Sequence, residues 1–223
     1  MFNGYTDETF EFFMAIKFNN NREFFQSNHD WYLRAVREPS LALAEELMDT
    51  VEKLDDSLER RPNKVVSRIN RDVRFSRDKS PYRDYMWIAF RRPGEARHST
   101  LGVYFDLSCE GGSCGMGFYD ENRPLMNALR RRLEAEPEEF LTLWDAVKDE
   151  FQLYPKSMKR MKIPETIPEA AKIWYNLKGF YIERELNDFS LLKSPELVGE
   201  LKRSFEKVKP LYDYFLSLPL EDA

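Results

Sequence analysis

The chain has 223 residues, of which 42% are hydrophobic and 14% aromatic, and its formal net charge is −5 at pH 7. This apolar content excludes a disordered chain. No apolar run approaches the roughly 20 residues of a membrane-spanning helix, and the acidic N-terminus lacks the basic segment of a signal peptide. We therefore expect a cytoplasmic protein with no membrane partner, long enough for one large domain or two small ones.

The first third of the chain has the pattern of helices. Thr6 followed by Asp7 is a typical helix start, Asn21 can cap a second helix, and Pro39 suits the first turn of a third. Further helices are predicted to begin at Asn122 or Pro124, at Pro137 and at Pro195. Arg130, Arg131 and Arg132 are predicted to form the solvated side of one of them.

The middle of the chain has the pattern of strands. Short strands are predicted near 65–70, 86–90 and 180–182, and a loop over 154–168. Residues 101–119 are predicted to form a hairpin that is closed by Gly111 and Gly112. Helices, then strands, then helices predict the α+β class, with a central antiparallel sheet packed by helices from both ends of the chain, as a single domain over 1–223.

The two faces of the predicted hairpin differ in composition. Apolar side chains share one face: Val103, Phe105, Leu107, Cys109, Cys114, Met116 and Phe118. The other face contains Gly115 and Gly117, which indicates that a helix or a ligand comes close to it. With the turn at Gly111 and Gly112, Cys109 and Cys114 would face each other; a disulfide then fits, although two reduced core cysteines are the simpler expectation.

The sequence contains no recognised cofactor or metal motif. The two cysteines and the two histidines, His29 and His98, do not have the spacing of a zinc site. There is no P-loop, no G-x-S-x-G and no G-x-G-x-x-G sequence. We therefore predict no metal site, and the cofactor and the oligomeric state stay unknown.

The segment RDVRFSRDKSPYRD, residues 71–84, concentrates the charge. Between residues 60 and 97 the sequence has twelve Lys or Arg and four Asp or Glu, although the whole chain is acidic. A basic island in an acidic protein indicates a local anion site and argues against general coating of DNA. Because no extended basic stripe accompanies this segment, we do not expect a nucleic-acid partner.

The same segment resembles the hallmark of a widespread family of bacterial and fungal proteins of unknown function. The pattern of that family is close to RI-x-RD-x-RFS-x-DK-[ST]-PY. The residues that match it are Arg68, Ile69, Arg71, Asp72, Arg74, Phe75, Ser76, Asp78, Lys79, Pro81 and Tyr82. NNNREFF at 19–25 is similar to a second motif of the family, NN-x-REWF. The resemblance covers essentially the whole chain and implies a shared fold, but no activity.

The first functional hypothesis is a pocket for a small anion such as a phosphate, a nucleotide or a carboxylate metabolite. Arginine offers a planar fork of donors that matches such groups. The pocket is predicted beside the face that holds Gly115 and Gly117. Its ligand-binding residues are predicted to be Arg68, Arg71, Arg74, Lys79, Tyr82, Arg83 and Tyr104.

Two alternatives remain open at this stage. One is an enzyme that acts on a phosphorylated or acidic substrate, with Asp72 or Asp106 as acid/base or metal ligand. The other is a structural or protein-interaction domain in which Arg-Asp pairs form an internal clamp. In that case Asp78 caps a turn and Phe75 is an anchor in the core.

Overall fold

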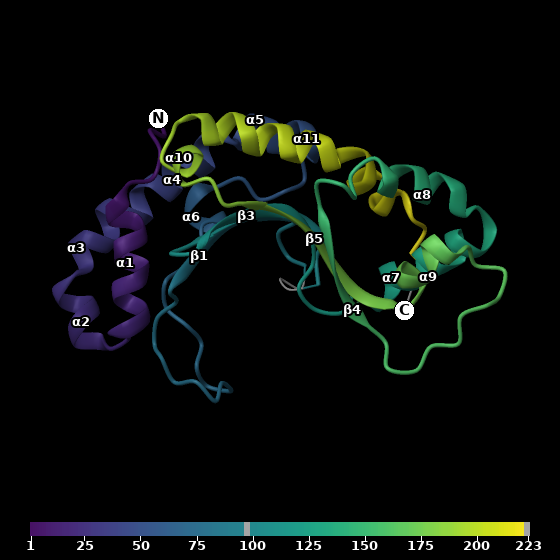
Figure 1. Ribbon diagram of the computed structural model, residues 1–223, viewed down its shortest axis with the longest axis horizontal. Coiled ribbons are helices and arrows are strands. Elements are labelled where there is room, and N and C mark those ends of the chain that lie inside the picture. Colours follow the sequence, from purple (N-terminus) through teal and green to yellow (C-terminus); the bar gives the residue numbers. More distant parts are fainter. Residues whose placement is uncertain (96–98, 221–223) are drawn as a thin grey trace. The chain divides into compact units, whose positions relative to one another are not determined.

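Figure 1 shows the computed structural model of the chain, which describes residues 1–95 and 99–220. It has the predicted α+β class. The helices before the sheet are α1 (Asp7–Phe18), α2 (Arg22–Ser27), α3 (His29–Tyr32), the π-helix η1 (Leu33–Arg37), α4 (Glu38–Glu46), α5 (Met48–Leu54) and α6 (Pro62–Val65). The strands are β1 (Tyr85–Arg91), β2 (Gly102–Ser108), β3 (Gly111–Gly117), β4 (Gln152–Ser157) and β5 (Leu177–Leu186). The later helices are α7 (Arg123–Ala135), α8 (Pro137–Asp145), α9 (Glu169–Tyr175), α10 (Phe189–Leu192) and α11 (Glu196–Ser217).

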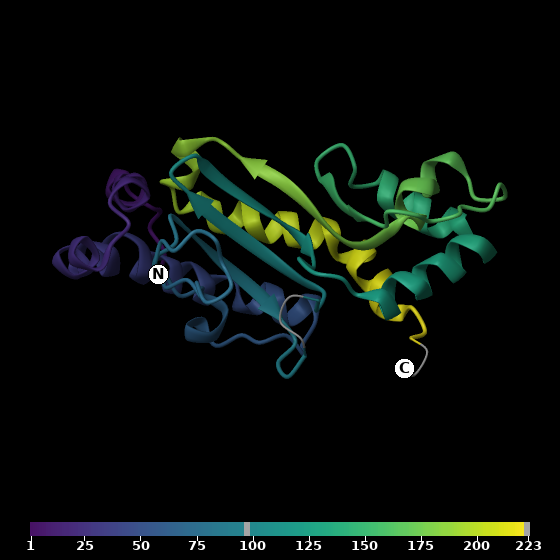
Figure 2. The ribbon, with the colours of Figure 1, turned by 90° about the horizontal axis from the view of Figure 1, so that it is seen from below.

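The five strands form one antiparallel sheet in the order β1-β2-β3-β5-β4, and Figure 2 looks onto it. β4 pairs with β5 from Gln152 opposite Glu183 to Ser157 opposite Leu177. β4 begins at Gln152 and extends to Ser157, into the segment predicted as a loop, so that prediction was wrong for 154–157. The prediction of a loop rested on Pro155, because proline cannot donate a hydrogen bond to a sheet. An edge strand such as β4 tolerates proline.

The chain divides into two compact units. Unit 1 comprises Met1–Phe90, Tyr104–Cys114 and Glu185–Arg203, and unit 2 comprises Arg91–Val103, Gly115–Arg184 and Ser204–Ala223. The strands β1, β2, β3 and β5 each contribute residues to both units. The expectation of a single domain over 1–223 stays a prediction.

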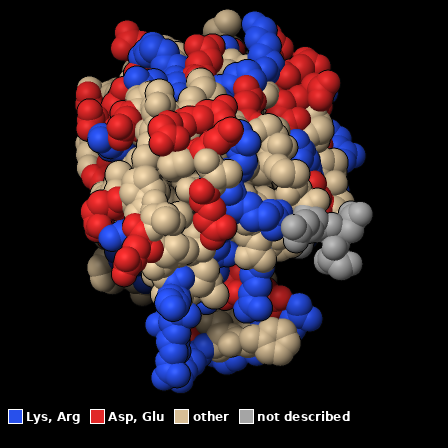
Figure 3. Space-filling view, turned by 90° about the vertical axis from the view of Figure 1, so that its right-hand side faces the viewer, with Lys and Arg blue, Asp and Glu red and all other residues tan. Residues whose placement is uncertain are grey.

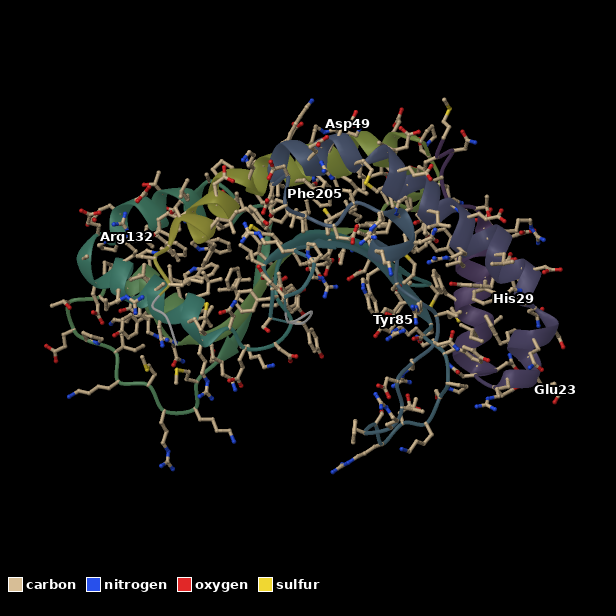
Figure 4. All side chains as sticks on the ribbon, turned by 180° about the vertical axis from the view of Figure 1, so that it is seen from behind. Glu23, His29, Asp49, Tyr85, Arg132 and Phe205 are labelled. Carbon is tan, nitrogen blue, oxygen red and sulfur yellow. The ribbon has the colours of Figure 1, made fainter. Side chains whose placement is uncertain are left out.

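In unit 1, the side chains of β1 alternate between a buried face and a more exposed face of the sheet. Met86, Ile88 and Phe90 are buried, whereas Trp87 is partly exposed and Tyr85 is exposed. Figure 4 shows Tyr85 pointing away from α5, the helix that contains Asp49. The predicted strand at 86–90 is confirmed. The one predicted at 65–70 is wrong, because α6 is followed there only by isolated bridges, Val66 to Ile88 and Asn70 to Tyr82.

The predicted hairpin is confirmed, but its turn lies two residues earlier than expected. Cys109 and Glu110 form the turn, and Gly111 begins β3. Ser113 Oγ donates a hydrogen bond of 2.9 Å to Asp106 Oδ1, which places these two residues opposite each other. Cys109 is therefore in the turn and not on the buried face. Neither Cys109 nor Cys114 forms a disulfide.

The two glycines of β3 in unit 2 accommodate a strand, and not the helix or ligand that we expected. A Cβ atom on Gly115 would lie 1.9 Å from the carbonyl oxygen of Ile182 on β5, and one on Gly117 would lie 2.5 Å from Tyr181 Cα. Gly117 also has a φ of +141°, which side chains rarely adopt. The glycine face is thus closed by the neighbouring backbone and cannot line a pocket there.

Arg130 in unit 2 corrects another expectation. It is buried and not on the solvated side of α7. Its Nε donates to the Tyr175 carbonyl at 2.8 Å, one Nη donates to Asn127 Oδ1 at 2.6 Å, and the other to the Leu177 carbonyl. The side chain therefore satisfies carbonyl groups between the end of α9 and the start of β5, where buried acceptors need a donor.

Two glycine substitutions test this packing. Gly115→Ala pushes a methyl group into the β5 backbone, so we expect a loss of stability of at least about 1–3 kcal/mol. Gly199→Ala in α11 has only the Arg203 side chain 3.5 Å away and should stabilise the helix by about 0.5–1 kcal/mol. Urea unfolding followed by circular dichroism measures both, and equal stabilities would contradict the β3–β5 approach.

Candidate functional site

The charged motif forms an arm that projects from unit 1. We call residues 67–84 the arm; it leaves α6 and returns into β1 (Figure 1). Its two sides are joined at the base by hydrogen bonds of 2.8 Å from Arg71 N–H to the Pro81 carbonyl and from Arg83 N–H to the Ile69 carbonyl. Figure 3 shows Lys and Arg side chains gathered at the lower end of that view, and six residues of the arm are Lys or Arg. The arm is thus a short ladder that ends in an exposed tip.

Asn20, at the end of α1, holds the base of the arm. Its side-chain Nδ2 donates to the Tyr82 carbonyl at 2.9 Å, and its Oδ1 accepts from Tyr82 N–H at 3.0 Å. The Tyr82 ring stacks on Phe25, with ring centroids 4.3 Å apart. Tyr82 is therefore an internal anchor of the arm, and its predicted role in ligand binding stays a prediction.

Two aspartates shape the tip through local hydrogen bonds. Asp72 Oδ1 accepts from Arg74 N–H at 3.2 Å and from Arg74 Nε at 3.0 Å, while its Oδ2 accepts from Nη2 at 2.7 Å. Asp78 accepts from Ser80 N–H at 2.9 Å and from Arg71 Nη1. The predicted turn at Asp78 is confirmed, and the predicted Arg-Asp pairs form, although they lie at the surface.

These pairs lower the pKa values of both carboxyl groups. The hydrogen bonds from Arg74 lower the pKa of Asp72 to about 2, and those from Arg71 and Ser80 hold the pKa of Asp78 well below its usual range. A carboxylate with so little affinity for protons is poorly suited to acid/base work at neutral pH. Asp106, the other candidate, lies outside the arm on β2, as does Tyr104.

The remaining cations of the arm fall into two groups. Lys79 Nζ donates to the Val73 carbonyl at 2.9 Å, and Arg83 Nη1 donates to the Arg68 carbonyl at 2.6 Å and to the Asn70 carbonyl. The guanidinium groups of Arg68 and Arg77 are exposed and have no hydrogen-bond or ion-pair partner among the described residues. Only these two are fully available to an external anion.

Three aromatic residues accompany these cations, and two of them were missed from the sequence. Phe75 at the tip is 94% exposed, so its predicted role as a core anchor is wrong. The Arg74 guanidinium lies 5.8 Å from the centre of its ring. At the base, Arg83 lies 4.6 Å from the Trp87 ring, whose centre is 5.8 Å from that of Tyr85. The signal for Tyr85 and Trp87 was the alternation of residues 85–90, which turns both side chains away from the core.

Within the described residues, no group of three or more His, Cys, Asp or Glu side chains could hold a metal ion. His98 lies outside the described residues. A hollow in unit 2 is lined by Glu95, Ser99, Thr100, Glu121, Asn122, Arg123 and Pro124, and thus by none of the predicted ligand residues. No described helix has both the length and the apolar character needed to cross a membrane.

Residues 8–214 match the family described as conserved hypothetical protein (DUF2461). The chain belongs to that family, as the resemblance of its central motif implied. No curated protein matches the chain.

The Asn20 clamp can be tested by hydrogen–deuterium exchange. Asn20→Ala removes both bonds to the Tyr82 backbone, so we expect faster exchange of the amides of Arg71, Tyr82 and Arg83. Asn19→Ala removes only a bond from its side chain to the Ala15 carbonyl and should leave those amides unchanged. Equal exchange in the two variants would show that the arm is held by other contacts.

The Asp72–Arg74 pair predicts a specific acid titration. Because the pKa of Asp72 is lowered from 3.8 to about 2, the pair favours the ordered tip above pH 3.8 and is lost as the pH falls towards 2. Arg74→Gln should return the pKa towards 3.8, while Arg77→Gln should leave it near 2. Carboxyl carbon NMR measures each midpoint, and a midpoint near 3.8 in the unaltered chain contradicts the pair.

Proposed function

We propose that the chain binds an anionic ligand through the arm. The single observation that supports this most is that Arg68 and Arg77 expose guanidinium groups with no partner among the described residues. The arm has six Lys or Arg and three Asp residues, in a chain that is otherwise acidic. A local cluster of this kind attracts anions even where the net charge of the protein is negative.

The other arginines of the tip can add to this site without leaving their carboxylates. Arg74 is 76% exposed, and Asp72 engages only its Nε and Nη2. The two N–H groups of Nη1 are therefore left for a ligand. Phosphate and carboxylate groups are the anions that match guanidinium geometry, so a phosphate, a nucleotide or a carboxylate metabolite is the ligand class.

A second candidate is the internal clamp, which the contacts of Arg71, Lys79 and Arg83 favour. Each of these side chains is bonded to a group within the arm. In this hypothesis the charges only hold the arm in shape, for example to present it to a partner protein. The two candidates differ in what Arg68 and Arg77 do, because neither group contributes to the internal bonds.

The proposal is tested by calorimetric titration with inorganic polyphosphate at low salt. We expect the unaltered chain to bind, and Arg68→Gln/Arg77→Gln to bind about tenfold more weakly, because two phosphate contacts are lost. Arg22→Gln/Lys53→Gln removes the same charge from exposed positions on α2 and α5 and should bind as before.

All of these variants should keep the melting temperature of the unaltered chain, because every altered side chain is exposed. Equal binding by the two double variants would show that only the net charge of the chain matters, and would contradict a site at Arg68 and Arg77. No binding of polyphosphate by the unaltered chain would leave only the clamp. A large loss of stability in Arg71→Gln, together with unaltered polyphosphate binding, would also favour the clamp.

A further inference from the structure

The arm combines its cations with aromatic rings that face solvent. A single exposed aromatic residue is common on protein surfaces, but Phe75 is 94% exposed at the tip and lies between Arg74 and Arg77 in the chain. The base of the arm repeats the combination, since Arg83 lies over Trp87 and Tyr85 is exposed beside it. Free ring faces next to guanidinium groups are thus available at both ends of the arm.

This combination differs from what a small anion needs. Small-molecule sites are concave and bury most of the ligand, whereas the tip projects and leaves Phe75 and Arg74 largely in solvent. An extended ligand can use several exposed contacts in series without enclosure. Its phosphates would contact the guanidinium groups, and its flat apolar groups would cover the rings.

We propose that the arm binds single-stranded nucleic acid; this inference rests on the anion binding proposed above. Proteins that bind single strands combine a basic path for the backbone with aromatic side chains on which bases stack. Phe75 and Tyr85 stack on bases, and Arg68, Arg74 and Arg77 contact phosphates. The acidic remainder of the chain, which argued against nucleic acid at the level of composition, confines the contact to the arm.

A double helix and a membrane fit the tip less well. The base faces of a duplex are covered by their neighbours, so Phe75 would have no face to stack on. Insertion of Phe75 into a bilayer would carry the ionised Asp72 and Asp78 towards hydrocarbon, where charges are costly. A base stacked on Phe75 leaves both carboxylates in water.

Unit 2 also has a cation beside an exposed aromatic ring. Tyr119 is 73% exposed, and Lys156 Nζ lies 5.9 Å from the centre of its ring. Tyr154 and Tyr181 stack in parallel, with ring centroids 4.9 Å apart and planes 7° apart. Lys156 Nζ also pairs with Asp120 Oδ1 at 3.4 Å, so the proposal is limited to the arm.

Fluorescence anisotropy with three labelled probes of equal length tests the inference: a single-stranded oligonucleotide, its duplex, and an abasic strand that keeps the phosphates but lacks the bases. We expect the single strand to bind most tightly. Phe75→Ala should weaken single-strand binding about tenfold, which is within the range for the loss of one stacked base, and should leave the abasic strand unaffected.

Phe18→Ala is the matched control, because Phe18 on α1 is also exposed, at 77%, but lies outside the arm. It should not alter binding of any probe. Arg77→Gln should reduce the slope of log affinity against log salt by about 0.7, the value for one phosphate contact with a single strand. Phe75 makes no buried contact, so its removal should leave the melting temperature unchanged.

Failure of this inference and failure of anion binding give different results. If the abasic strand and polyphosphate bind as tightly as the oligonucleotide, and Phe75→Ala has no effect, base stacking is refuted while anion binding stands. If none of these probes binds, both proposals fall. Binding to vesicles of phosphatidylserine and phosphatidylcholine that depends on Phe75, with no binding of oligonucleotides, would overturn the inference in favour of a membrane.

Discussion

The position of the arm depends on one carboxamide. Asn20 bonds to both the N–H and the carbonyl of Tyr82, as a neighbouring strand would, and Phe25 stacks on the same tyrosine. Among the described residues, the arm is joined to the helices before the sheet by these contacts and by a hydrogen bond of 3.4 Å from Arg37 Nη1 to the Ser67 carbonyl at its start. The turn between α1 and α2 thus explains why NNNREFF and the charged motif occur together in this sequence: the first segment holds the second in place.

Side-chain alternation predicted the hairpin and the buried face of β1, because a sheet with one covered face leaves a period of two in the sequence. Glycine was ambiguous, because it serves both in turns and at close backbone contacts. Gly111 and Gly112 are typical of a turn, yet they belong to β3. A Cβ atom at Gly111 would lie 2.9 Å from Asn187 Oδ1, so the glycine is needed there for close packing. Charge was ambiguous for Arg130, since a run of three arginines does not reveal which one meets buried carbonyl groups.

The candidate site was predictable in position but not in detail. The density of charge in residues 71–84 located the arm, and the sequence Asp78-Lys79-Ser80 predicted its turn. Nothing in the sequence distinguishes arginines bonded to aspartate, such as Arg74, from those that remain available, such as Arg77, because both lie among alternating charges. Phe75 was expected in the core for the usual reason that burial of a large ring is favourable; only the geometry of the tip shows that no core is within its reach.

The bonds that shape the tip close over very short distances in sequence. Asp72 bonds to Arg74, Asp78 to Ser80 and Arg71, and Arg71 N–H to Pro81. The contour of the tip is therefore a property of residues 70–82 themselves, and the rest of the chain contributes only the direction in which the tip points. A ring-closed peptide of residues 70–82 would contain both partners of each of these bonds, whereas Arg68 and Tyr85 of the proposed binding surface lie outside it.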